Sequence, residues 1–291
     1  MYPPRIIKCL KEYNRSTFLK DLAAGTTVGV VALPLAMAFA IAVGCTQVTP
    51  SMGLVTAVVA GFMISLFSGS KFQIGGPTGA FVVIIAGVVG THGTSGLILC
   101  TLLAGLFLIG FGLCRLGSLI KFVPYPVTTG FTAGIAVTIF CTQVKDILGL
   151  TIAGELPADF ISKWQCYLQH IGSVNPWAVG VTLGTIVLIL LTKRLFPRVP
   201  AMLVGMLAAT VVCRAFSLPV ETIGSRFGEL PAGLPVPGIP AVDWHHITEL
   251  VQPAFIIALL AAVESLLSAS VADGMTGSRH HPNTELVGQG I

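Results

Sequence analysis

The stretch 71–81, which reads Lys-Phe-Gln-Ile-Gly-Gly-Pro-Thr-Gly-Ala-Phe, constrains the fold of this chain more than any other part. It lies between two apolar runs, yet Gly75, Gly76 and Pro77 interrupt any continuous helix. Just before them a short strand is expected, and proline is typical of a helix start. The helical pattern that follows, 78–91, covers about 21 Å at 1.5 Å per residue, less than a bilayer core of about 30 Å. The sequence therefore predicts a half-helix that begins near the middle of a membrane.

A helix start at that depth is a candidate anion site. The first backbone N–H groups have no partner within the helix, and the helix dipole places partial positive charge there. Interrupted segments of this kind mark substrate sites in secondary transporters, because broken backbone survives in a membrane only against protein or a watery cavity. The alternative is a tight turn outside the membrane followed by a short tilted span.

The composition indicates an all-α polytopic membrane protein. Hydrophobic residues make up 54% of the chain and charged residues 10%, whereas soluble domains carry about 25% charged residues. Residues 1–21 are polar and basic, without the apolar run of a cleavable signal, and are expected to form a cytoplasmic N-terminal segment. The membrane part is expected to occupy residues 22–291. Its segments are predicted at 22–43, 52–67, 78–91, 97–113, 128–144, 177–191, 201–212 and 251–271.

The distribution of basic residues predicts the orientation. With the N-terminus inside, twelve of the sixteen Lys and Arg residues lie in the N-terminal segment or in inner loops, and only Lys145, Lys163, Arg214 and Arg226 lie outside. Both ends of the chain are then cytoplasmic. We therefore expect an integral protein of the cytoplasmic (inner) membrane, with an amphipathic interfacial helix in the outer loop 145–176.

Glu264 is the only acidic residue within a predicted apolar span. A carboxylate there costs roughly 3 kcal/mol to insert, so we expect it to face a cavity, where desolvation favours its neutral form. Such a group suits the uptake and release of a proton. Ser268, one turn later on the same face, could share that proton or a coordinated cation. The alternative is a structural carboxylate hydrogen-bonded between helices.

Sequence features typical of enzymes and metal sites are missing. There is no HExxH or GxGD motif, no phosphate-binding loop and no dinucleotide fingerprint. The seven cysteines have no paired spacing, and the adjacent histidines at 245–246 and 280–281 are unsuited to a shared metal. We expect no enzymatic activity, no metal or other cofactor apart from a coupling proton or sodium ion, and no nucleic-acid partner.

The chain resembles the SulP family of sulfate permeases and related anion transporters. The matching segments are 21–25, 33–40, 50–54, 69–71, 74–78, 124–127, 130–131, 264–268, 272–277 and 283–291. The resemblance implies two inverted repeats of seven helices, divided into a mobile core and a gate, in a protein that forms homodimers in the bilayer. This chain would hold the first repeat and the first helix of the second, and would lack the remaining half and the cytoplasmic STAS domain.

The resemblance also implies which residues form the site. The anion would lie between two half-helix starts, one in each repeat, beside the first span. The substrate-binding positions in this chain would be Leu35, Phe39, Gly76, Pro77, Thr78, Gly79 and Ala80. Leu35 departs from the glutamine that many family members have there. Glu264 stands where proton- or sodium-coupled members carry an acid, and Ser268 stands at a neighbouring hydroxyl position.

We therefore expect a secondary transporter for a small anion of the sulfate, bicarbonate or dicarboxylate class that works by alternating access. We expect Glu264 to couple it to a proton, with sodium as the alternative coupling ion. One alternative is a nucleobase transporter of the same fold, which would need polar side chains to recognise the edges of a heterocycle. The other is a truncated membrane remnant that does not transport.

Overall fold

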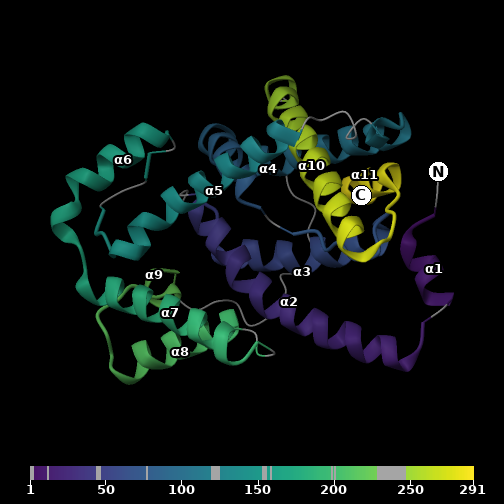
Figure 1. Cartoon of the computed structure of the whole chain (residues 1–291). Coiled ribbons are helices and arrows are strands. Elements are labelled where there is room, and N and C mark those ends of the chain that lie inside the picture. The colour runs from purple at the N-terminus through teal and green to yellow at the C-terminus, as the bar shows by residue number, and fades with distance from the viewer. Residues whose placement is uncertain are drawn as a thin grey trace.

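A computed structural model describes residues 3–11, 13–43, 47–76, 78–118, 125–152, 156–157, 159–197, 199, 201–227 and 247–291. Within these ranges the regular elements are helices. Figure 1 shows that they form two groups. The first group contains α1 (Arg5–Lys11), α2 (Arg15–Ala42), α3 (Pro50–Phe67), the short helix η1 (Gly79–Phe81), α4 (Val82–Leu113), α10 (Ile247–Thr276) and α11 (Pro282–Gly290). The second contains α5 (Tyr125–Leu148), α6 (Phe160–Gln169), η3 (Ile171–Ser173), α7 (Pro176–Leu195), α8 (Ala201–Ala215) and α9 (Ile223–Phe227).

The predicted membrane segments are helical. Among the described residues, five helical runs are long and apolar enough to cross a bilayer: α2, α3, η1 with α4, α7 and α10. α8 is apolar but shorter, and α5 covers the remaining predicted segment. α2 begins at Arg15, ahead of the predicted start at residue 22, because Asn14 caps it: the Asn14 side chain accepts a hydrogen bond from the Thr17 N–H at 2.9 Å.

The predicted half-helix is the first part of a longer helical run. Gly93 has a φ of 67° and a ψ of −168°, a left-handed conformation that favours glycine, and it divides α4 into two helices. The first therefore runs from η1 to His92. The short strand predicted before it is absent: residues 71–76 carry neither strand nor helix. A strand needs a neighbour for its backbone hydrogen bonds, and here the Gln73 N–H binds the Ser70 hydroxyl at 3.3 Å instead.

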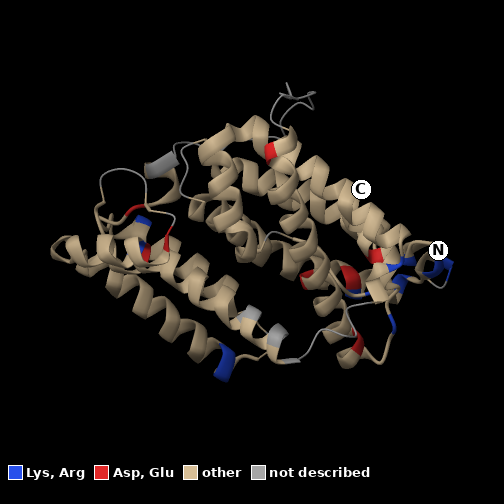
Figure 2. Cartoon of the chain, turned by 90° about the horizontal axis from the view of Figure 1, so that it is seen from above, with Lys and Arg blue, Asp and Glu red and all other residues tan. Residues whose placement is uncertain are grey.

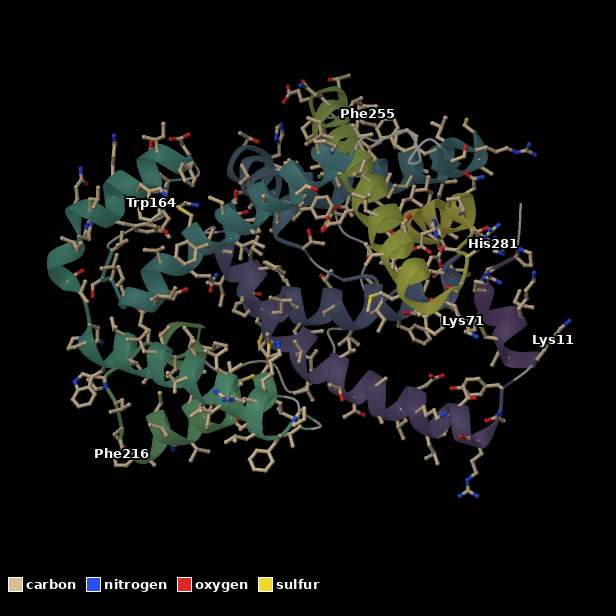
Figure 3. All side chains as sticks on the ribbon, in the orientation of Figure 1. Lys11, Lys71, Trp164, Phe216, Phe255 and His281 are labelled. Atoms are coloured by element: carbon tan, nitrogen blue, oxygen red, sulfur yellow. The ribbon has the colours of Figure 1, made fainter. Side chains whose placement is uncertain are left out.

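α10 packs along α4 and forms the main apolar core. Small alanines on α10, such as Ala254 and Ala258, are fully buried and allow the two helices to approach closely. Phe255 packs edge-on against Phe107 and Phe111, with ring centroids 5.6 and 5.9 Å apart (Figure 3). This packing holds the first half of α10 against the part of α4 that follows Gly93.

The amphipathic helix predicted in loop 145–176 is α6. Its Tyr167 is buried, and the Tyr167 hydroxyl donates to the Cys141 carbonyl of α5 at 3.0 Å. Trp164, labelled in Figure 3, packs edge-on against Tyr167, with ring centroids 6.0 Å apart. Asp159 caps the helix by accepting from the Ser162 N–H at 3.0 Å, and this hydrogen bond lowers the pKa of the Asp159 carboxyl. α6 thus packs its apolar face on α5, and its position at a membrane interface stays a prediction.

Four segments that the sequence assigned to the inner side meet at one end of the molecule. The Arg5 N–H of α1 donates to the Ser68 carbonyl at 3.0 Å, and the Gly117 N–H donates to the Asn283 side chain at 3.0 Å. Figure 2 shows basic residues gathered near both labelled termini at this end. Contacts between 5 and 68 and between 117 and 283 therefore join four regions that are far apart in the sequence.

Segments assigned to the outer side also meet one another. The His92 imidazole lies 2.8 Å from the Glu249 carboxylate and ties the end of the half-helix to the first turn of α10. In the second group, the Asn175 side-chain amide donates to the Pro219 carbonyl at 2.6 Å and joins two predicted outer loops. In each of these contacts, a predicted outer segment meets another predicted outer segment.

Candidate functional site

The half-helix begins with a threonine cap. Thr78 has an extended backbone, with φ −129° and ψ 153°, and precedes η1 directly. The Thr78 hydroxyl accepts a hydrogen bond from the Ala80 N–H at 3.1 Å. One of the first amides of the helix is therefore satisfied by a side chain, as in an ordinary N-cap.

The same hydroxyl contacts the acidic residue of α10. It donates its single proton to Glu264 Oε2 at 3.0 Å, so its orientation is fixed by one donor and one acceptor contact. Glu264 is partly buried and lies between the two acids near the ends of α10, Glu249 and Asp273. The two features that the sequence singled out, the half-helix start and the carboxylate in the last span, are thus joined directly.

Two more helices reach the half-helix start. A Cβ atom on Gly79 would lie 2.4 Å from Ile139 Cδ1 of α5 and 3.3 Å from Phe39 Cε1 of α2. Any side chain at this position would displace the end of the Ile139 side chain, so glycine allows the close approach. Helices α2, α4, α5 and α10 therefore converge around Thr78 and Gly79.

The structure brings together some of the predicted site residues and separates others. Phe39, Thr78, Gly79 and Glu264 form one cluster, with Ala80 bound to the cap. Leu35 is 46% exposed, and Gly76 is exposed as well. Ser268 is exposed, and the hydrogen bond of Glu264 goes to Thr78. Pro77 lies outside the described residues.

Sequence reasoning missed a second buried carboxylate. Glu285 of α11 is 0% exposed and lies behind the site, where it accepts hydrogen bonds from the turn 68–70 and from Ser265. Glu285 lies after the last predicted span, where an acidic residue has no cost of membrane insertion to mark it as unusual. The signal that could have found it is the glycine pair Gly288 and Gly290 just after it, which is typical of closely packed helices.

The electrostatics of the site are mixed. A helix start carries partial positive charge, which favours an anion. A carboxylate 3.0 Å from the cap hydroxyl opposes an anion at the same place unless a proton or a cation neutralises it. Within the described residues, no group of three or more His, Cys, Asp and Glu side chains could hold a metal ion. The helix start and the carboxylate therefore have opposite effects on an anion at this place.

Several apolar spanning helices around a half-helix that starts inside the helix bundle define this chain as a polytopic membrane protein built like a secondary transporter. Residues 18–291 match the model of the Sulfate permease family. The chain belongs to that family.

The curated relatives are transporters by name. The putative sulfate transporter YvdB of Bacillus subtilis (strain 168) is 47% identical over 282 residues, which cover 97% of this chain and 52% of the relative. The bicarbonate transporter BicA of Picosynechococcus sp. is 31% identical over 281 residues, which cover 93% of this chain and 49% of the relative. The chain thus spans about half the length of the curated relatives it matches.

Solved structures have the same fold. The transmembrane domain of a cyanobacterial bicarbonate transporter BicA matches with a TM-score of 0.80 at 31% identity, covering 96% of this chain and 71% of that chain. The murine anion transporter Slc26a9 in its inward-facing state matches with a TM-score of 0.81 at 17% identity, covering 98% of this chain and 51% of that chain. At 17% identity the likeness shows the fold alone.

Proposed function

We propose that this chain forms the half-helix part of a secondary transporter that carries a small oxyanion, such as sulfate or bicarbonate, together with a proton or a sodium ion. The observation that carries the proposal is the hydrogen bond between Thr78 and Glu264, because it joins the expected anion site to the one carboxylate that can take up a cation there. The names of the relatives, a putative sulfate transporter and a bicarbonate transporter, agree with this substrate class.

The negative charges of the anion and of Glu264 would couple anion transport to a cation. Two unit negative charges 4 Å apart repel each other by about 4 kcal/mol at an effective dielectric constant of about 20. An anion at the half-helix start and an ionised Glu264 therefore disfavour each other. A proton on Glu264, or a sodium ion beside it, removes the repulsion, so anion and cation bind together. Their release on the other side after a conformational change would give coupled transport by alternating access.

The orientation belongs to the same proposal. We place both termini on the cytoplasmic side, because the inner loops predicted from their basic residues meet around α1 and α11. His92 and Glu249 then face the outer side. The half-helix start would be reached from the cytoplasm past the turn at 68–71.

The test uses the full-length transporter that contains this chain, reconstituted in vesicles with radiolabelled sulfate or bicarbonate. Glu264→Gln keeps a hydrogen-bonding side chain but cannot release a proton or hold a sodium ion by charge. We expect this variant to retain anion exchange and to lose accumulation driven by an inward proton or sodium gradient. Glu249→Gln, at the exposed start of the same helix, is the matched control and should leave gradient-driven accumulation in place.

Three results would contradict the proposal. If the gradient still drives accumulation by the Glu264→Gln variant at the level of the parent, Glu264 is structural. If the parent takes up uracil in preference to both anions, the protein is a nucleobase transporter. Uptake of neither class by the full-length parent would indicate a protein that does not transport.

A further inference from the structure

We propose that Ser265 and Glu285 are positioning residues: they fix the broken segment 68–78 in register with α10, so that Thr78 faces Glu264, and thereby set the apparent affinity for the transported anion. The inference rests on the proposed function and goes beyond it, since neither side chain contacts the expected anion position. A hydrogen-bond network links three elements behind the site: the turn after α3, α10 and α11.

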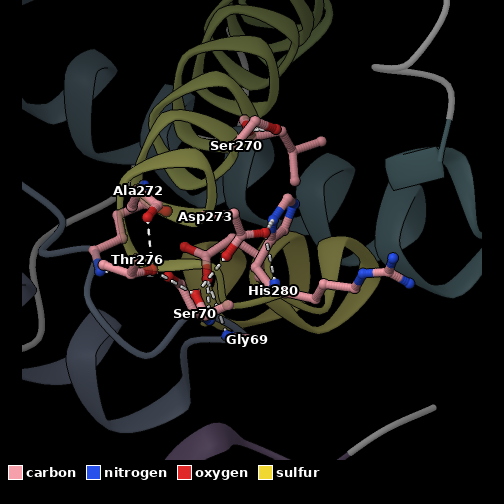
Figure 4. A network of polar contacts seen from close by, with 12 residues as sticks. Gly69, Ser70, Ser270, Ala272, Asp273, Thr276 and His280 are labelled. Atoms are coloured by element: carbon pink, nitrogen blue, oxygen red, sulfur yellow. Dashed lines mark hydrogen bonds and ion pairs between the residues drawn. The ribbon is translucent and has the colours of Figure 1, made fainter.

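Glu285 holds the start of the broken segment. Its Oε2 accepts from the Ser68 hydroxyl at 2.5 Å, from the Gly69 N–H at 2.9 Å and from the Ser70 N–H at 3.1 Å. These donors belong to the turn that leaves α3, and all of them are buried together with the carboxylate. Figure 4 shows Gly69 and Ser70 beside the C-terminal end of α10. Three donors on one oxygen fix this turn against α11.

The close approach of the turn depends on glycine. A Cβ atom on Gly69 would lie 2.3 Å from the His281 carbonyl oxygen and 2.8 Å from the Glu285 nitrogen. A Cβ atom on Gly288 would lie 2.5 Å from the Phe67 carbonyl oxygen. The turn and α11 are therefore in backbone contact, which leaves little freedom for the Glu285 carboxylate.

Ser265 holds the middle of the segment and uses all of its hydrogen-bonding capacity. Its hydroxyl donates to Glu285 Oε1 at 3.2 Å and accepts from Gln73 Nε2 at 3.0 Å and from Gln289 Nε2 at 2.7 Å. A hydroxyl has one proton and two lone pairs, so this arrangement is saturated. Ser265 is 5% exposed, and a buried hydroxyl with three partners has one favoured orientation.

The broken segment is therefore attached at three points. Glu285 binds residues 68–70, Ser265 binds Gln73, and Glu264, the residue before Ser265, binds Thr78. Two of these points are consecutive residues of α10. A segment without helix or strand has no hydrogen-bonded ladder of its own to set its position, so these side chains set it. If the contact between Ser265 and Gln73 is lost, Thr78 lies against Glu264 in only a fraction of the molecules. The apparent affinity for the anion is then the intrinsic affinity multiplied by that fraction.

The experiment uses Ser265→Ala and Gln73→Met in the full-length transporter, with radiolabelled sulfate or bicarbonate uptake as the readout. Gln73→Met removes one hydrogen bond only, since Gln73 Oε1 is buried without a hydrogen-bond partner in the described structure. We expect each variant to raise KM about five- to tenfold with Vmax within about twofold. The double variant should raise KM no further than Ser265→Ala alone, because both changes break the same contact. Ser270→Ala is the matched control: the Ser270 hydroxyl bonds only the Leu266 carbonyl of its own helix, at 2.7 Å, and KM should not change.

A purely structural role would give another result. Thermal unfolding of the purified variants measures general destabilisation, and the KM increase is expected in preparations whose melting temperature stays near that of the parent. A KM of Ser265→Ala within twofold of the parent's, or KM increases that multiply in the double variant, overturns the inference. Failure of the parent to transport any anion overturns the proposed function instead. Glu285→Ala is unsuitable as a first test, because it leaves buried donors of the turn unpaired and is expected to impair folding.

Discussion

At the scale of single residues, Thr78 has the most demanding role. Its one hydroxyl caps the half-helix through the Ala80 N–H and donates to Glu264. The backbone amide of Ala80 is therefore engaged by the cap, and an anion at this end of the helix would bind next to the cap hydroxyl. The side chain, and not the helix dipole alone, determines the geometry of the site.

Thr78→Val tests this role. The substitution keeps the shape of the side chain but removes the cap, which contributes about 1 kcal/mol, and the hydrogen bond to Glu264, which contributes about 1.5 kcal/mol more. We expect the initial rate of anion uptake by the full-length transporter to fall by roughly tenfold or more. Thr78→Ser restores the hydroxyl and should recover most of the rate. Thr138→Val, where the hydroxyl bonds only the Gly134 carbonyl of its own helix, serves as the control. Parent-level uptake by Thr78→Val would refute the role.

At the scale of helices, the position of α11 depends on glycines of α4. A Cβ atom on Gly112 would lie 2.5 Å from Val287 Cγ2 and 2.7 Å from the Asn283 carbonyl oxygen. A Cβ atom on Gly110, two residues earlier and on the opposite face of the helix, would meet nothing within 4 Å. Only one face of α4 is in contact with α11. This contact places Glu285 of α11 beside the turn 68–70 that it binds.

Gly112→Ala and Gly110→Ala form a matched pair. Alanine is the better helix former by about 1 kcal/mol, so both changes favour the helix equally. In the Gly112→Ala variant the added methyl group forces α11 away from α4. We expect the free energy of unfolding to fall by about 1–3 kcal/mol and the melting temperature in detergent to fall with it. The melting temperature of the Gly110→Ala variant should equal or exceed that of the parent. Equal melting temperatures for the two variants would mean that the close approach of α11 to α4 contributes nothing to stability.

At the scale of the whole molecule, the orientation in the membrane is a prediction from the distribution of basic residues. Cys114, at the end of α4, is exposed and belongs to a predicted inner loop. Thr151, after α5, is exposed and belongs to a predicted outer loop. We expect these two positions to lie on opposite sides of the membrane.

Cysteine labelling tests the orientation. In a full-length variant whose only cysteine is Cys114, a membrane-impermeant maleimide should react in inverted vesicles and not in intact cells. A cysteine-free variant carrying Thr151→Cys should react in intact cells. A permeant maleimide, which should label both variants, is the control for accessibility. Labelling of Cys114 in intact cells would reverse the proposed orientation.

The sequence by itself determined the parts of this protein that depend on local composition. Apolar length fixed the spanning helices, and the glycines and proline at 75–77 marked the break before the half-helix, because both effects act within a few residues. The predicted strand at 72–74 was wrong for the complementary reason. A strand exists only through its neighbour, and no neighbouring strand is found among the described residues.

Only the tertiary structure decided which polar groups meet. Thr78 and Glu264 are 186 positions apart, and Ser68 and Glu285 are 217 apart. The residue pattern within one span does not predict which distant residues form these hydrogen bonds. The partners are set by the packing of α10 and α11 on α4 through glycine and alanine contacts. For the same reason Ser268, which shares a predicted helix face with Glu264, is exposed, whereas Ser265 is buried at the centre of the network. Helical spacing gives the face of a residue, and the neighbouring helices decide what that face contacts.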